Sequence, residues 1–308
     1  MKIAIVGAGA MGCLYGARLT QAGEEVWLVD TWHEHIAALQ GQGLSVISAN
    51  GVETVPVKAT MDPGEIGPVD LVMVFVKAHA THNAALTAAI LQGPDTLVMT
   101  LQNGLGNAEQ IAEVVGAERV LVGTTAMGAT MAGPGRVIDN GKGVTHIGNF
   151  AASVTRKLYE IAAVFSRSGL YTIVDANVES LRWSRLTVNA GLNALSAVTG
   201  LTNGQLAAYP ETKELMSRAV AEAEAVARAH GAVLPHANMQ AQVVANAQAT
   251  KDNKSSMLQD VLKKRRTEID AINGAIVREG AALGVATPVN EVLTLLVKAQ
   301  ERTYLQGE

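Results

Sequence analysis

The first thirty residues carry, in order, a strand-like segment, a glycine-rich turn, a helix-like segment, a second strand-like segment and an acid. Residues 2–6 form a short apolar run suited to a buried parallel strand, and Gly7, Gly9 and Gly12 follow with G-x-G-x-x-G spacing. In this pattern the first glycine permits a tight turn, the second lets the backbone approach a pyrophosphate, and the third lets the helix pack closely on the strand. The N–H groups at the start of that helix then face the phosphates. The residues expected to contact a dinucleotide here are Gly7, Gly9, Ala10, Met11 and Gly12.

A glycine pattern alone also fits a strand-to-helix turn that binds no ligand. The segments around it distinguish a dinucleotide site from such a turn. The second strand, expected over residues 25–29, ends in Asp30, close to the offset of about 20 residues at which an acid hydrogen-bonds the adenosine ribose. A carboxylate there would repel a 2′-phosphate, so the sequence favours NAD over NADP. NADP remains an alternative because His33 and His35 are weak phosphate partners, although residues 31–35 contain no arginine.

Composition indicates an ordinary two-domain enzyme. The chain has 308 residues, of which 48% are hydrophobic and 17% charged, and a formal net charge of −4 that gives no sign of nucleic-acid binding. The basic run at residues 263–266 suits a solvated helix end or turn better than a phosphate patch. Glycines interrupt the apolar amino-terminal stretch, and no run approaches the about 18 residues of a membrane span. We therefore expect no membrane partner, and the presence of a single cysteine in the chain fits a cytoplasmic protein.

The single cysteine, Cys13, excludes an intramolecular disulfide and any multi-cysteine metal site. Cys13 has two alternative interpretations. Its place near a helix N-terminus could lower the thiol pKa and make it redox-sensitive, or it is a small packing residue beside the turn. The seven histidines show no HExxH or comparable spacing, so no metal is expected.

Strand-like and helix-like segments alternate up to about residue 122, which predicts a parallel sheet covered on both faces. The expected elements are strands at 70–76, 96–99 and 120–122 and helices at 80–91 and 107–115. Segments 136–139 and 144–147 then look like antiparallel strands that extend this sheet, before a helix at 153–168 and a strand at 171–174. The predicted fold class is α/β, with a Rossmann-type doubly wound domain over residues 1–176.

From about residue 177 the periodicity is helical almost throughout, which predicts an all-helical domain over residues 177–308. Substrates commonly bind in the crevice at the carboxyl ends of parallel strands, so the helical domain is expected to form its other wall.

Polar residues follow two of the expected strands and recur on one expected helix. Lys77 directly follows the strand at 70–76, and Asn103 follows the next one; a solvated lysine and an ordinary Asn-Gly turn are the alternatives. Arg185, Asn189 and Asn193 recur every four residues and so share one helix face. Asparagines inside an apolar helix suggest a polar site, although interhelical hydrogen bonds would also explain them.

Two later segments combine hydroxyls with acids: SSMLQD at 255–260 and TEID at 267–270. In the second, Glu268 is expected in the first turn of a helix. If Thr267 or Arg266 caps that helix, Glu268 does no more than compensate the helix dipole.

These segments together resemble the ketopantoate reductase (2-dehydropantoate 2-reductase) family over essentially the whole chain. The matching pieces are GAGAMG at 7–12, FVKA at 75–78, QNG at 102–104, NxxxN at 189–193, SSMLQD at 255–260 and TEIDAINGAIV at 267–277. The resemblance implies a cofactor domain and a helical domain that hold a 2-oxo acid between them while a hydride passes from reduced nicotinamide to its keto carbon.

By motif match, the resemblance also implies roles for single residues. Lys77 and Asn103 would line the nicotinamide and substrate region, and Glu268 would lie beside the reacting group. The residues that would hold the substrate's carboxylate and hydroxyl are Asn189, Asn193 and Ser256.

The chain departs from the family pattern at two positions. Arg185 occupies the place of the family's catalytic lysine, four residues before the first asparagine of NxxxN, and Asp30 stands where usual members carry a basic residue for NADP. We expect Arg185 to act as a fixed cation, with the proton supplied by Lys77 or by a water held by Glu268. The departures also suit an NAD-linked 2-hydroxy-acid dehydrogenase acting outside pantothenate synthesis, or a dinucleotide-sensing protein without turnover. The general frequency of homodimers favours a homodimer.

Overall fold

The computed structural model describes residues 1–141, 143–151 and 153–305. The chain forms two compact units. The first contains residues 1–102 and 107–178, and the second contains residues 103–106 and the chain from 179 onward.

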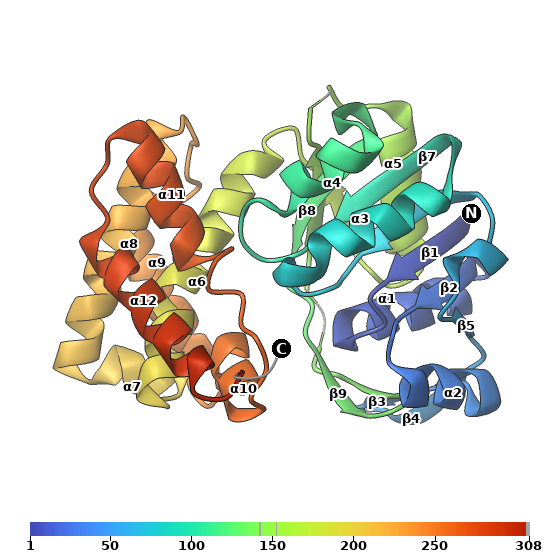
Figure 1. Ribbon diagram of the computed structural model, residues 1–308, viewed down its shortest axis with the longest axis horizontal. Helices are drawn as coiled ribbons and strands as arrows, with labels where there is room; N and C mark the ends of the chain where they lie inside the picture. The colour runs from blue at the N-terminus through green and yellow to red at the C-terminus, as the bar shows by residue number, and fades with distance from the viewer. Residues whose placement is uncertain (142, 152, 306–308) are drawn as a thin grey trace. The chain divides into compact units, whose positions relative to one another are not determined.

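The first unit is built on an eight-stranded sheet (Figure 1). In spatial order its strands are β5 (Lys58–Thr60), β2 (Glu25–Val29), β1 (Lys2–Val6), β6 (Val69–Val74), β7 (Gln92–Thr100), β8 (Val120–Thr125), β11 (Thr145–Asn149) and β12 (Thr172–Val174). Neighbours are parallel except β8 and β11. From β1 the chain proceeds to β2 on one side, and from β6 it proceeds to β7 and β8 on the other. The strand order therefore reverses between β1 and β6, which places the switch point of a doubly wound sheet at their carboxyl ends.

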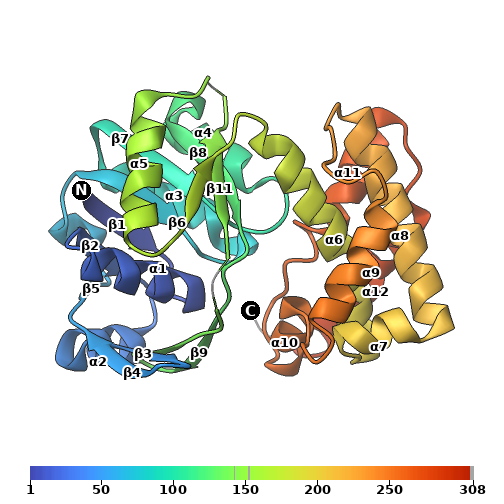
Figure 2. The same cartoon turned by 180° about the vertical axis from the view of Figure 1, so that it is seen from behind.

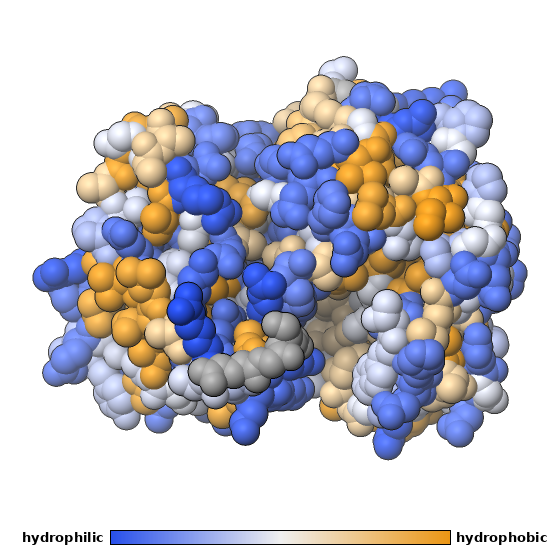
Figure 3. All heavy atoms as spheres, in the orientation of Figure 1, coloured by the Kyte–Doolittle hydropathy of each residue, from blue (hydrophilic) through white to orange (hydrophobic). Residues whose placement is uncertain are grey.

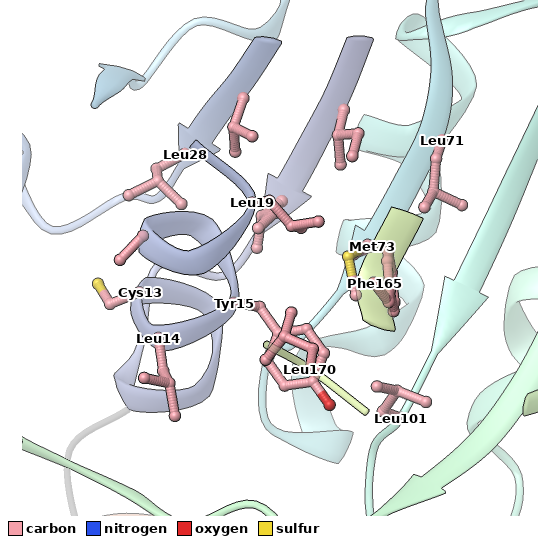
Figure 4. Close-up of a cluster of buried hydrophobic side chains, with 14 of the residues drawn as sticks. Cys13, Leu14, Tyr15, Leu19, Leu28, Leu71, Met73, Leu101, Phe165 and Leu170 are labelled. Atoms are coloured by element: carbon pink, nitrogen blue, oxygen red, sulfur yellow. The ribbon is translucent and has the colours of Figure 1, made fainter. Parts of the chain in front are cut away.

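Alternate side chains of each strand belong to two different cores, one on each face of the sheet. Ile3 and Ile5 of β1 join the core formed with α1 (Ala10–Gln21) and α5 (Arg156–Arg167). Figure 4 shows part of this core, in which Tyr15 of α1 faces Phe165 of α5. Ala4 and Val6 instead join the core on the opposite face. The helices of that core are α3 (Thr81–Ile90) and α4 (Asn107–Val115). The predicted doubly wound sheet is confirmed.

A second, four-stranded sheet corrects one expectation. Its spatial order is β4 (Gly51–Val55), β3 (Leu44–Ser48), β10 (Arg136–Asp139) and β9 (Ala129–Gly133). Segment 136–139 was expected to extend the main sheet, and this is wrong: β10 pairs parallel with β3 and antiparallel with β9, and only β11 adds antiparallel to β8. The hairpin β3–β4 offers β10 an edge that buries Val137 with Leu44 and Val46.

The second unit is helical in all its regular elements within the described residues, as Figure 2 shows. Its helices are α6 (Val178–Thr199), α7 (Asn203–Ala208), α8 (Pro210–Ala229), α9 (Met239–Ala249), α10 (Ser256–Leu262), α11 (Asn273–Leu283) and α12 (Pro288–Arg302). Their core includes Trp183 and Leu186 of α6, Val220 of α8 and Ile276 of α11. The remaining helices, in the first unit, are α2 (His33–Gln42) and the short η1 (Pro63–Glu65), η2 (Ala78–Ala80) and η3 (Ala117–Arg119).

Apolar side chains also reach the surface on two helices. Leu86 and Ile90 lie exposed on α3, and Val292, Leu295 and Leu296 lie exposed on α12. Figure 3 shows both as orange patches among hydrophilic side chains. Among the described residues, no helix combines the length and apolar character needed to cross a membrane.

Candidate active site

The glycine turn between β1 and α1 is shaped by two close packing contacts. A Cβ at Gly7 would lie 2.7 Å from the backbone nitrogen of Val76, and Gly7 has a φ of +100°, which L side chains rarely adopt. A Cβ at Gly12 would overlap the carbonyl oxygen of Gly7. These two glycines are therefore required by the fold itself.

Gly9 has no such structural reason to be glycine. Its φ of −69° suits any residue, and a Cβ there would meet no atom within 4 Å. Gly9 also caps α1 with no side-chain hydrogen bond, so the first N–H groups of that helix have no side-chain partner from the cap. An open cradle at a helix N-terminus fits the pyrophosphate of a dinucleotide, whose approach a side chain at Gly9 would block.

Asp30 lies at the carboxyl end of β2, directly beyond the last strand residue, and is half-buried. Its Oδ1 accepts a 3.0 Å hydrogen bond from the backbone N–H of Trp32. The backbone thus helps to orient the Asp30 carboxylate.

The environment of Cys13 contradicts two expectations from the sequence, a redox-sensitive Cys13 and a phosphate-binding His35. Cys13 is fully buried, and burial, with the charge of Asp30, raises the pKa of its thiol to about 12. The redox-sensitive interpretation is therefore wrong, because no thiolate forms near neutral pH. His35 is equally buried, and its Nδ1 accepts a 2.9 Å hydrogen bond from the Gly135 N–H, so it does not reach a cofactor phosphate. Burial also lowers the pKa of His35 and keeps it neutral.

Lys77 lies at the carboxyl edge of the sheet beside the glycine turn. It follows β6 by three residues and is half-buried, with an extended backbone that leads into η2. Phe75 donates its backbone N–H to Val6 at 2.8 Å, which fixes this end of β6 against β1. Gln102 belongs to the QNG motif but was given no role from the sequence; its Nε2 donates to the carbonyl of Val76 at 2.7 Å and links the segments that follow β6 and β7.

The Asn103 loop, residues 103–106, packs within the second unit. Gly104 has a φ of +87°, and a Cβ there would lie 2.7 Å from the carbonyl carbon of Ala271, while Leu105 donates its N–H to Ala271 at 2.9 Å. Glycine is thus needed both for the turn and for the close approach. In the same loop Asn103 Oδ1 accepts a 3.3 Å hydrogen bond from Asn189 Nδ2.

The expected polar face of α6 carries three residues of graded burial. Arg185 is exposed, Asn189 is half-buried and Asn193 is buried. Arg185 reaches solvent, but surrounding protein atoms partly displace its hydration and lower the pKa of its guanidinium. Within residues 1–141, 143–151 and 153–305, Arg185 has no ion pair and the Asn193 amide no hydrogen bond. The interhelical hydrogen bonds considered as an alternative therefore do not explain Asn193.

The two serines of the SSMLQD segment have different positions. Ser255 caps α10: its Oγ accepts from the Leu258 N–H at 3.1 Å and donates to the carbonyl of Asn193 at 3.4 Å. Ser256 is the first residue of the helix and is exposed. The structure thus brings this segment to α6 beside Asn193, with Ser255 as the structural hydroxyl.

Glu268 is buried in a turn, not in a helix. The dipole-compensating alternative is wrong because α11 begins only at Asn273. The carbonyl of Glu268 accepts from the N–H groups of Ala271 and Ile272 at 3.0 and 3.1 Å. Ala271 is also the residue that anchors the Asn103 loop, so one turn brings the backbones of Asn103 and Glu268 together.

The described residues contain no group of three or more His, Cys, Asp or Glu side chains that could hold a metal ion. A doubly wound unit with an open glycine cradle, together with a helical unit that carries Asn189 and Asn193 on one helix face, has the architecture of a two-domain dinucleotide-binding protein.

The chain belongs to the ketopantoate reductase family. Residues 3–152 match the family model "Ketopantoate reductase PanE/ApbA", and residues 177–301 match "Ketopantoate reductase PanE/ApbA C terminal". A 2-dehydropantoate 2-reductase from Halobacterium salinarum is 37% identical over 98% of this chain and 99% of its own length. One from Pyrococcus horikoshii is 33% identical over 98% of each chain.

Solved structures agree with this assignment. The PanE/ApbA family ketopantoate reductase from Ralstonia eutropha superimposes with a TM-score of 0.92 at 36% identity, covering 99% of both chains. A D-mandelate dehydrogenase solved with NADH and anilino(oxo)acetate gives a TM-score of 0.91 at 32% identity, also covering 99% of both chains. This chain is accordingly an NAD(P)-dependent oxidoreductase.

Proposed function

We propose that this protein reduces a 2-oxo acid, ketopantoate or a related branched or hydroxylated acid, to the 2-hydroxy acid. The main support for this proposal comes from Arg185, which has no ion pair within the described part of the chain. It lies on the α6 face that also bears Asn189 and Asn193. A guanidinium donates hydrogen bonds to the oxygens of a 2-oxo acid, and side-chain amides recognise its carboxylate and hydroxyl groups. One arginine with amides suits a single carboxylate, whereas a phosphorylated substrate calls for more cations.

Arg185 is proposed to polarise the carbonyl and stabilise the alkoxide that develops from it. A fixed cation that is partly removed from water does this well, because it needs no reorganisation as charge develops. Asn189 and Asn193, with Ser256, hold the substrate's carboxylate and hydroxyl in this proposal. Asn189 is already oriented by its hydrogen bond to Asn103. When bound, the reduced nicotinamide supplies the hydride that adds to C2.

The proton needs a source other than Arg185. A guanidinium stays protonated throughout the working pH range even when burial lowers its pKa, so it is a poor general acid. Lys77 and a water held by Glu268 are the proposed donors. Either group would protonate the alkoxide oxygen as it forms and complete the hydroxy acid.

NADH is the proposed cofactor in preference to NADPH. The oriented Asp30 carboxylate supports this, since it can accept hydrogen bonds from ribose hydroxyls and repels a 2′-phosphate. Asp30→Asn and Asp30→Arg are expected to shift the ratio of kcat/KM values toward NADPH. Wild-type kinetics that are equal or better with NADPH would overturn the assignment.

A second candidate is an NAD-linked 2-hydroxy-acid dehydrogenase that acts outside pantothenate synthesis. It is favoured by Asp30 and by the similarity to the D-mandelate dehydrogenase that was solved with NADH. Relative turnover of ketopantoate and of other branched or aromatic 2-oxo acids separates the two candidates.

The expectation of a homodimer is tested by light scattering on the purified protein.

The test of the proposal compares Arg185→Ala with Arg218→Ala. Arg218 is an exposed arginine of α8 that pairs with Glu214, so it controls for the loss of one surface charge in the same unit. Arg185→Ala should lose about 3–4 kcal/mol of transition-state stabilisation, the order seen when one oxyanion donor is removed. Arg218→Ala should match wild type. Wild-type turnover by Arg185→Ala would place Arg185 outside the active site.

A further inference from the structure

Trp32 is a surface tryptophan held in a fixed position at the carboxyl end of β2. Its ring stacks on that of His35, with centroids 5.1 Å apart and planes 18° from parallel. Its Nε1 donates to Glu34 at 2.8 Å, and its backbone N–H donates to Asp30. The residue is nevertheless 38% exposed, so part of this anchored aromatic side chain remains in contact with water.

The ring beneath Trp32 is itself anchored to the glycine turn. Because Nδ1 of His35 accepts the Gly135 N–H, its proton lies on Nε2. That nitrogen lies 3.4 Å from Cys13 Sγ, and Cys13 Sγ in turn donates a 3.1 Å hydrogen bond to the carbonyl of Ala8, between Gly7 and Gly9. Trp32 is therefore connected to the Asp30 carboxylate by a hydrogen bond and to the phosphate-binding turn through the buried side chains of His35 and Cys13.

The order of these groups matches the order of groups in an adenine dinucleotide. The pyrophosphate fits the open cradle at Gly9, the adenosine ribose fits Asp30, and the base lies beyond the ribose. Two residues beyond Asp30 the chain presents the Trp32 indole, and a fixed aromatic ring binds a nucleobase by stacking. We propose that the outer face of Trp32 stacks on the adenine of the cofactor. This inference rests on the dinucleotide site and is independent of the oxo acid that is reduced.

The test compares NADH with reduced nicotinamide mononucleotide, which lacks the adenosine half. Trp32→Ala should weaken NADH binding about 5- to 150-fold, as expected for loss of one base stack. Its binding of the mononucleotide should stay unchanged, and Trp32→Phe should restore most of the NADH affinity. Tyr159→Ala, which removes an exposed aromatic residue of α5 in the same unit, is the matched control and should bind both like wild type.

A titration of the wild-type protein with ADP-ribose provides a readout that needs neither turnover nor a stable alanine variant. ADP-ribose should quench indole emission, and Trp32→Phe should lose that quenching while still binding ADP-ribose by calorimetry. Equal weakening of NADH and mononucleotide in Trp32→Ala would show that Trp32 only supports the fold. Unchanged NADH affinity in Trp32→Ala would place the adenine elsewhere. Either result would overturn the proposal and leave the proposed reduction standing.

Discussion

Replacing Gly9 with alanine should separate cofactor binding from folding. At φ −69° alanine is unstrained, and its Cβ would enter open space. The reduced entropy of the unfolded chain stabilises by about 0.4–1 kcal/mol, and alanine is a poorer N-cap than glycine by a similar amount. The two effects nearly cancel, so the melting temperature should change by no more than about 2 °C.

The same methyl group should weaken NADH binding strongly. It would occupy the space where the pyrophosphate meets the N–H groups of α1, and the loss of one charge-assisted hydrogen bond costs about 1.5–3 kcal/mol. This corresponds to a rise in Kd of about 10- to 150-fold. Thermal melts and calorimetric titration with NADH measure the two effects on the same sample.

Gly12→Ala is the matched control, with the opposite expectation for stability. Its Cβ would overlap the carbonyl oxygen of Gly7, so backbone must move and overpacking should cost about 1–3 kcal/mol. If Gly9→Ala binds NADH like wild type, the pyrophosphate does not approach Gly9 and the reasoning fails. A large fall in its melting temperature would equally refute the claim that Gly9 has no structural role.

Three further outcomes are expected. Arg185→Lys should retain activity but acquire an additional alkaline limb in kcat/KM, absent from the wild-type profile, as the introduced lysine loses its proton; identical profiles would contradict this. Burial tends to raise the pKa of Glu24, but pairing with the N-terminal amine and Arg167 outweighs this and lowers it. The free energy of unfolding in urea should therefore be higher for wild type than for Glu24→Gln. This difference should be complete above pH 4.5 and should disappear as pH falls through the lower pKa that Glu24 has in the folded protein. A difference that does not change with pH would contradict this. Cys13, with its pKa raised to about 12, should resist iodoacetamide at pH 8 until the protein unfolds, and rapid labelling of folded protein would contradict its burial.

Local sequence patterns were sufficient for the elements that bear the cofactor cradle. β1, α1, β2 and Asp30 follow from an apolar run, glycine spacing and one terminal acid within thirty residues, and the structure has each of them where expected. The helical second unit follows equally from periodicity that persists over many turns.

Features set by contacts between distant segments could not be predicted. Nothing within residues 136–139 indicates that their partner is β3 rather than the main sheet, because that choice depends on a hairpin about ninety residues earlier. The sequence does not show which of the two adjacent serines caps α10, and only the structure identifies Ser255 as the N-cap. The platform under Trp32 likewise depends on Gly135, 100 residues from His35.

The reduction of a 2-oxo acid with NADH is tested most directly by measuring NADH oxidation by the purified protein. The assay offers a panel of 2-oxo acids that includes ketopantoate, with a sugar phosphate as the unrelated substrate. At least one small branched or hydroxylated 2-oxo acid should be reduced, NADH should be used better than NADPH, and the sugar phosphate should be inert. Efficient turnover of the sugar phosphate with every 2-oxo acid inert would contradict the proposed function.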